Sequence, residues 1–169
     1  MINLTDKPTR IYLDADLIRQ SVLRAVAFKD YKPTRMFSFL LEHPEIERNI
    51  SLFTVSEIVV NILRDPQRIH AYEQNKKSIL DALRVLQDMY FINVIEYDKD
   101  DKNKTMKGFW VGGDIVEISA LLLSAKDAVH VCIAMRNDLM LVSNEPNFRK
   151  AADIYPKIMT DDHFYKQFN

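Results

Sequence analysis

The stretch Ile11-Tyr12-Leu13-Asp14-Ala15-Asp16 indicates how this chain folds. Its three leading apolar residues are typical of a buried strand, and the acids that follow stand where a helix pattern begins. Residues 16–28 then carry apolar side chains at helical spacing. A strand that passes directly into a helix is the building unit of an α/β fold with a parallel sheet.

The same alternation of strands and helices continues to the end of the chain. We predict strands over 10–13, 50–54, 91–96, 140–143 and 157–159. We predict helices over 16–28, between Pro33 and Pro44, and over 56–63, 69–90, 115–123, 128–135 and 161–168, with a polar loop over 98–107. The expected fold is a three-layer α/β/α sandwich, with a mainly parallel sheet of about five strands in one domain over residues 1–169.

Four acids occupy equivalent places in this pattern. Asp14 and Glu145 each follow a predicted strand, Glu57 follows the apolar run 52–55, and Asp127 opens a helix. The carboxyl ends of parallel strands meet at one edge of a sheet, where ligands bind. Closely spaced carboxylates repel one another by about 4 kcal/mol per pair at an effective dielectric constant of 20. We therefore expect these carboxylates to bind a hard divalent cation such as Mg²⁺ or Mn²⁺.

Helix capping offers an alternative interpretation of each acid taken singly. Thr54-x-x-Glu57 fits a capping box, and Ser124-x-x-Asp127 approximates one. Asp14 or Asp16 could cap the helix that follows them. Capping does not explain why every such acid follows a strand or opens the matching helix in one ordered set, so we favour a metal site.

Composition excludes several other functions. The chain has three glycines, so it contains neither a Walker A loop nor a G-x-G-x-x-G motif. Its one cysteine, Cys132, lies in an apolar helical run and is expected to be a core residue. The N-terminal residues are polar and no apolar run is long enough to span a bilayer, so we expect a cytoplasmic protein without a membrane partner.

Five segments of the chain carry a family resemblance. They are Ile11-Tyr12-Leu13-Asp14-Ala15-Asp16, Thr54-Val55-Ser56-Glu57-Ile58, Lys126-Asp127-Ala128-Val129-His130-Val131-Cys132-Ile133-Ala134, Leu141-Val142-Ser143-Asn144-Glu145-Pro146-Asn147-Phe148, and Ile158-Met159-Thr160 with Phe164. Together and in this order they resemble the PIN domain, the fold of VapC-type toxin nucleases and related ribonucleases. The most specific is the third segment, which is similar to the family's Asp-Ala-x-x-x-x-x-Ala helix.

The resemblance implies an endoribonuclease that hydrolyses RNA phosphodiester bonds with Mg²⁺ or Mn²⁺. Asp14 and Asp127 are the expected direct metal contacts, and Glu57 is expected to act through a water or to deprotonate the nucleophile. Glu145 is the expected outer or second-metal ligand, although the family usually has Asp in this block. Four more residues are expected to support these ligands: Asp16, Ser143, Asn144 and Asn147.

The resemblance also implies partners. RNA is the expected substrate, a small antitoxin protein is expected if the chain is the toxin of a toxin–antitoxin pair, and a homodimer is the expected assembly. The resemblance assigns no role to His130, which the apolar helix pattern predicts to be a satisfied core histidine or a support for the ligands.

Two rival functions stay open at the level of sequence. One is a PIN-like module that binds RNA or protein without cutting, which Glu145 and the net charge of −1 both favour. The other resembles a haloacid-dehalogenase-type phosphatase, because Asp14-Ala15-Asp16 and the later Gly113-Asp114 with Glu117 echo that group's acidic motifs.

Overall fold

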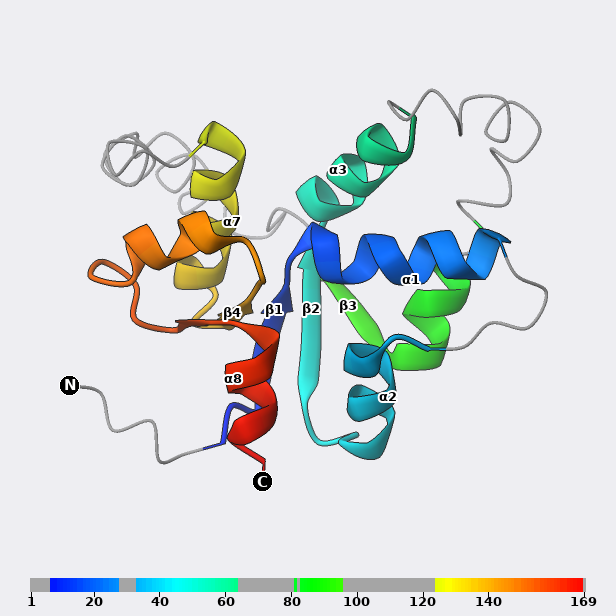
Figure 1. The fold of residues 1–169 in the computed structure, drawn as a ribbon, viewed down its shortest axis with the longest axis horizontal. Coiled ribbons are helices and arrows are strands. Elements are labelled where there is room, and N and C mark those ends of the chain that lie inside the picture. Colours follow the sequence, from blue (N-terminus) through cyan, green and yellow to red (C-terminus); the bar gives the residue numbers. More distant parts are fainter. Residues whose placement is uncertain (1–6, 28–32, 64–80, 82, 96–123, 169) are drawn as a thin grey trace, which may run out of the picture. The chain divides into compact units, whose positions relative to one another are not determined.

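The structure is a computed structural model that describes residues 7–27, 33–63, 81, 83–95 and 124–168. Its elements are β1 (Arg10–Leu13), α1 (Ala15–Ala27), α2 (Arg35–Glu42), β2 (Glu47–Ser51), α3 (Leu52–Leu63), β3 (Ile92–Ile95), α7 (Ala125–Arg136), β4 (Met140–Val142), η1 (Pro146–Ala151), β5 (Ile158–Met159) and α8 (Asp161–Lys166) (Figure 1). Residues 81 and 83–90 are also helical, as predicted. The predicted loop 98–107, the helix 115–123 and the first part of the helix 69–90 lie outside the described residues, as do Gly113, Asp114 and Glu117.

The five strands form one sheet in the order β3-β2-β1-β4-β5. This order confirms the predicted α/β class, with helices connecting strands as in the parallel sheet of a three-layer α/β/α sandwich. β4 and β5 pair in parallel, with Leu141 opposite Ile158 and Val142 opposite Met159. Among the described residues, no helix combines the length and the apolar character needed to cross a bilayer.

Two compact units make up the chain. One comprises Met1–Tyr12 with Ile95–Asn169, and the other comprises Leu13–Val94. Each unit has its own buried apolar side chains, for example Val131 and Leu141 in the first. Ile58 is one of those in the second. The expectation of a single domain stays a prediction.

In the unit Leu13–Val94, the boundary between β2 and α3 corrects the sequence prediction. We expected a strand over 50–54 and a helix from residue 56, but α3 begins at Leu52. The physical reason is a capping box between Ser51 and Thr54. The Thr54 amide donates to Ser51 Oγ at 3.1 Å, and the Ser51 amide donates to Thr54 Oγ1 at 3.4 Å. The apolar pair Leu52-Phe53 therefore forms the first turn of a helix, not the end of a strand.

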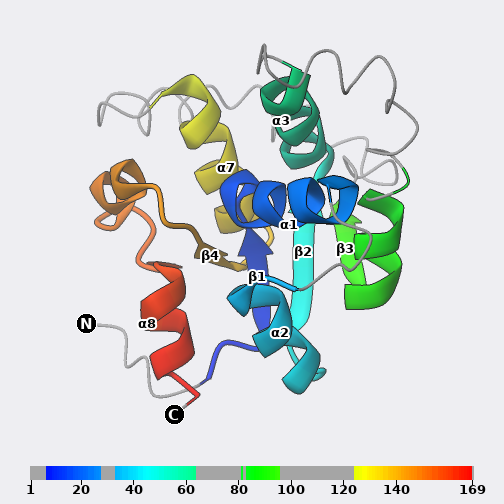
Figure 2. The same ribbon diagram turned by 45° about the vertical axis from the view of Figure 1, so that its right-hand side comes forward.

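The same unit packs its helices by aromatic and buried polar contacts. α1 and α3 lie against each other (Figures 1 and 2). The rings of Phe37 and Tyr90 pack against each other with centroids 4.4 Å apart and planes tilted by 59°. The buried guanidinium of Arg48 donates to the backbone oxygens of Leu40 and His43, which closes the C-terminal end of α2.

In the other unit, the turn from α7 to β4 is a Schellman motif. The Leu139 amide donates to the Ala134 oxygen at 2.9 Å, and the Asp138 amide donates to the Met135 oxygen at 3.2 Å. Asp138 takes the left-handed conformation that this motif requires, with φ of 53°. Asp is one of the few residues besides Gly that visits this region routinely.

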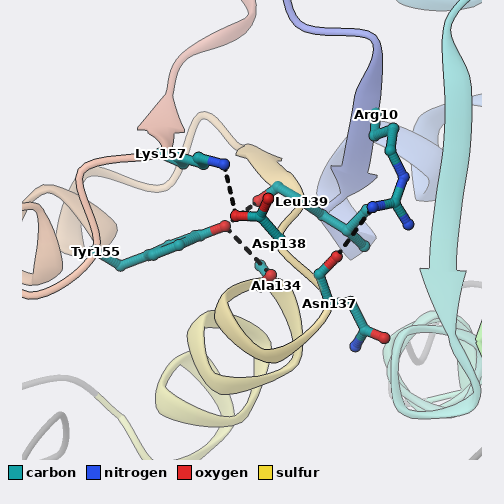
Figure 3. Close-up of polar contacts among 7 residues, drawn as sticks. All are labelled: Arg10, Ala134, Asn137, Asp138, Leu139, Tyr155 and Lys157. Carbon is teal, nitrogen blue, oxygen red and sulfur yellow. Dashed lines mark hydrogen bonds and ion pairs between the residues drawn. The ribbon is translucent and has the colours of Figure 1, made fainter. Parts of the chain in front are cut away.

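Side chains on both sides of this turn hold it in place (Figure 3). Lys157 pairs with the Asp138 carboxylate at 2.5 Å, and this hydrogen bond lowers the pKa of Asp138. The Tyr155 hydroxyl lies 2.5 Å from the Leu139 oxygen and 3.2 Å from the Ala134 oxygen. Arg10, at the start of β1, donates to the Asn137 oxygen at 3.4 Å. The end of α7 is thus fixed to two other segments of its unit, residues 155–157 and the start of β1.

Candidate metal centre

Asp14 and Glu57 come together in the unit Leu13–Val94. One carboxylate oxygen of each lies within 4.8 Å of the other, as the sequence predicts for ligands of one cation. Asp14 is 5% exposed and stands between β1 and α1, where its Oδ1 accepts from the Ala15 amide at 2.7 Å. Two carboxylates at 4.8 Å repel by about 3.5 kcal/mol at an effective dielectric constant of 20. A bound cation would relieve that repulsion.

The start of α3 removes the capping explanation for Glu57. Since Ser51 caps the helix and Thr54 returns the reciprocal bond, the predicted box between Thr54 and Glu57 is wrong. Glu57 lies in the second turn of α3, beyond the free amides of the first turn. Its place near Asp14 therefore has no explanation in helix capping.

Asp16 does not join this pair as a support. It lies in the first turn of α1, where its carboxylate forms an ion pair with Arg19 at 3.3 Å. Its side chain is 49% exposed. We therefore assign Asp16 to the surface of α1. The phosphatase alternative needs both acids of Asp14-Ala15-Asp16 in one site, and this position of Asp16 argues against it.

Asp127 occupies the first turn of α7 in the other unit. Ser124 caps this helix by accepting from the Asp127 amide at 3.2 Å, as the approximate capping box predicted. The Asp127 side chain is 5% exposed. One turn later on the same helix is His130, which is 1% exposed. Side chains three residues apart share one face of a helix, so Asp127 and His130 project from the same side of α7.

The segment after β4 has mainly local bonds. The Ser143 hydroxyl accepts from the Glu145 amide at 3.0 Å, and the Glu145 carboxylate accepts from the Asn147 amide at 3.3 Å as the N-cap of η1. Asn144 Oδ1 accepts from the Asp161 amide at 3.3 Å, at the start of α8. These contacts of the predicted support residues shape the loop after β4 and the starts of η1 and α8.

Among the described residues of the unit Leu13–Val94, the candidate metal ligands are Asp14 and Glu57. Asp127 and Glu145 belong to the other unit, together with His130. Carboxylate oxygens are the donors that hard divalent cations such as Mg²⁺ prefer. His130 is a buried histidine of its unit, as the apolar helix pattern predicted, and its Nδ1 lies 2.8 Å from the Tyr12 hydroxyl.

Comparison of the sequence with family models and with curated proteins gives no match.

Proposed function

We propose that this protein is a metal-dependent endoribonuclease that hydrolyses phosphodiester bonds of RNA. The observation that carries the proposal is the approach of the Asp14 and Glu57 carboxylate oxygens to within 4.8 Å. A second support is the buried carboxylate of Asp127 at the start of α7. Acids of this kind are costly to hold together unless a cation or a reaction uses them.

The chemistry follows from the roles that these side chains suit. Asp14 and Glu57 would hold the cation, which when bound supplies positive charge to the phosphate and lowers the pKa of a bound water. Glu57 would accept the proton of the attacking water as its oxygen bonds to phosphorus. The bond from phosphorus to one ribose oxygen then breaks, and that oxygen takes a proton from solvent as it leaves. The expected role of Asp127 as a direct metal contact stays a prediction from sequence.

Cleavage of RNA by wild type, Asp14→Asn and Glu57→Gln tests this proposal. A mixed pool of structured and single-stranded RNA is incubated with each protein in Mn²⁺, in Mg²⁺ and in EDTA. We expect cleavage by wild type with a metal and none in EDTA. Because a general base contributes at least about 100-fold to rate, Glu57→Gln should lose about that much or more.

The matched control is Asp88→Asn, which removes an exposed carboxylate from the helix over residues 83–90. This variant should cleave as wild type does. Folded wild-type protein that cleaves no RNA with either metal, or Asp14→Asn that cleaves as fast as wild type, would contradict the proposal.

One observation favours a second candidate function, a module that binds RNA or protein without cleaving RNA. The Glu145 carboxylate accepts from the Asn147 amide as the cap of η1, so the acid expected in this block already has a structural partner. We infer that the chain would be an RNA- or protein-binding module if this fourth acid is essential to catalysis. Glu145→Asp, with a shorter side chain that matches the family pattern, should then gain cleavage that wild type lacks. A small antitoxin partner, a homodimer and a cytoplasmic location stay predictions from sequence.

A further inference from the structure

An aromatic side chain lies one helical turn from Glu57 on the same face of α3. A capping box between Ser51 and Thr54 starts this helix at Leu52. Phe53 thus belongs to the first helical turn and Glu57 to the second. Side chains four residues apart lie one above the other on a helix, about 6 Å apart along its axis. Phe53 is therefore a neighbour of one acid of the candidate metal centre.

The face of α3 that carries Glu57 is apolar on either side of this acid. Phe53 is partly exposed, as is Glu57 itself. Val60 follows Glu57 by three residues on the same face and is 40% exposed. Thr54 and Ile58, by contrast, are fully buried. Apolar side chains exposed next to one another mark a binding surface, whereas single exposed ones are ordinary.

The acid between these apolar side chains indicates what they contact. A cation held by Asp14 and Glu57 would attract a phosphate, because it brings positive charge to this part of the unit. In a nucleic acid, each phosphate is joined through a sugar to a flat base. Proteins that bind single strands stack such bases on aromatic side chains. A base beside the bound phosphate is therefore the apolar group that RNA would present to Phe53.

We propose that Phe53 stacks on the nucleobase next to the scissile phosphate, with Val60 extending the apolar contact. This inference rests on the proposed function, since it concerns the RNA that the same site would cleave. The backbone of Phe53 is fixed in place, because its oxygen accepts from the Ser56 hydroxyl at 2.8 Å. Since every base has a flat face, the contact favours unpaired bases with little preference for sequence.

Binding of two ligands to the full chain tests the inference. One is a single-stranded RNA oligonucleotide, and the other is the same ribose-phosphate chain without bases. Anisotropy of a fluorescent label is measured in Ca²⁺, which binds carboxylate oxygens, and cleavage is followed separately in Mn²⁺. Phe53→Leu keeps an apolar side chain but removes the ring. It should bind RNA about fivefold or more weakly than wild type, the least that one stacked base contributes, and the baseless chain equally well. Phe53→Tyr, which keeps a ring, should bind both as wild type does.

Leu52→Ala is the matched control, because Leu52 is 54% exposed in the same turn of α3 but on a different face from Glu57. It should leave the binding of both ligands unchanged. RNA binding by Phe53→Leu as tight as by wild type, or an equal loss for RNA and the baseless chain, would overturn this inference alone. Wild type that binds RNA through Phe53 but cleaves none in Mn²⁺ or Mg²⁺ would overturn the proposed function alone. Wild type that binds no RNA would overturn both.

Photocrosslinking of wild type decides the question even if Phe53→Leu fails to fold. RNA that carries iodouridine reacts on irradiation with an aromatic ring stacked on that base. Peptide mapping should find the attached RNA at Phe53. Crosslinks that form only at other residues would contradict the inference.

Discussion

Tyr155 shows how one buried hydroxyl can hold a helix end. Its oxygen lies against the backbone oxygens of Leu139 and Ala134, which belong to the turn between α7 and β4 (Figure 3). Burial, with a smaller contribution from the charge of Asp138, raises the pKa of Tyr155 to about 12 from its ordinary value of 10.0. The hydroxyl therefore keeps its proton, and its donor role, well above physiological pH.

We expect Tyr155→Phe to lower the free energy of unfolding by about 1–2 kcal/mol, because it removes the buried hydroxyl that donates to the Leu139 oxygen. The pKa in the folded state is above the unfolded value, so this contribution is complete below pH 10 and is lost as pH rises toward about 12. Denaturant unfolding between pH 8 and pH 12 measures both effects. Tyr165→Phe is a comparison at another buried tyrosine, on α8. An equal alkaline loss of stability in wild type and Tyr155→Phe would contradict this account.

At the scale of elements, the start of α3 decides where Glu57 lies. With Ser51 as the cap, the first turn begins at Leu52 and Glu57 falls in the second turn. If the helix began at residue 56, as the sequence suggested, Glu57 would lie in the first turn, where its carboxylate could accept from backbone amides that have no partner within the helix. A shift of four residues thus changes the interpretation of Glu57 from a capping residue to a candidate ligand.

We expect Ser51→Ala to lower the free energy of unfolding by about 1 kcal/mol, the usual cost of an N-cap. Ser56→Ala is the matched control, since Ser56 is exposed on α3 and its hydroxyl donates only to the Phe53 oxygen. That change should cost a few tenths of a kcal/mol or less. Chemical denaturation of the two variants provides the comparison. A larger loss from Ser56→Ala than from Ser51→Ala would mean that the helix starts where the sequence pattern placed it.

At the scale of the whole molecule, a cation that binds only the folded chain must raise its stability. We expect Mn²⁺ at about 100 times its dissociation constant to add about 2.7 kcal/mol to the free energy of unfolding. Asp14→Asn should remove most of this gain, and it should be slightly more stable than wild type in EDTA because a carboxylate repulsion is gone. Thermal melts in EDTA and in Mn²⁺ measure both effects. An equal Mn²⁺ gain in both proteins would place the cation elsewhere.

Much of the fold could be predicted from local patterns. β1, α2, α7 and the two C-terminal strands lie where apolar periodicity predicted them, within a residue or three. The start of α3 could not be predicted in this way, because Leu52 and Phe53 suit a strand or a helix equally. Only the hydrogen bonds between Ser51 and Thr54 show that these two residues begin a helix. η1 was not predicted, since a short 3₁₀ helix has no strong apolar period.

The sequence by itself determined the α/β class, five strands, and the acids that follow or open its elements, because these depend on residue order and spacing. Only the tertiary structure decided which side chains meet. In the tertiary structure the carboxylate oxygens of Asp14 and Glu57 lie within 4.8 Å of each other. Asp16 forms an ion pair with Arg19, and the Glu145 carboxylate caps η1. The tertiary structure also showed Tyr12 bonded to His130 across 118 residues of sequence. Contacts between distant residues depend on how strands and helices pack, and spacing along the chain does not encode that packing directly.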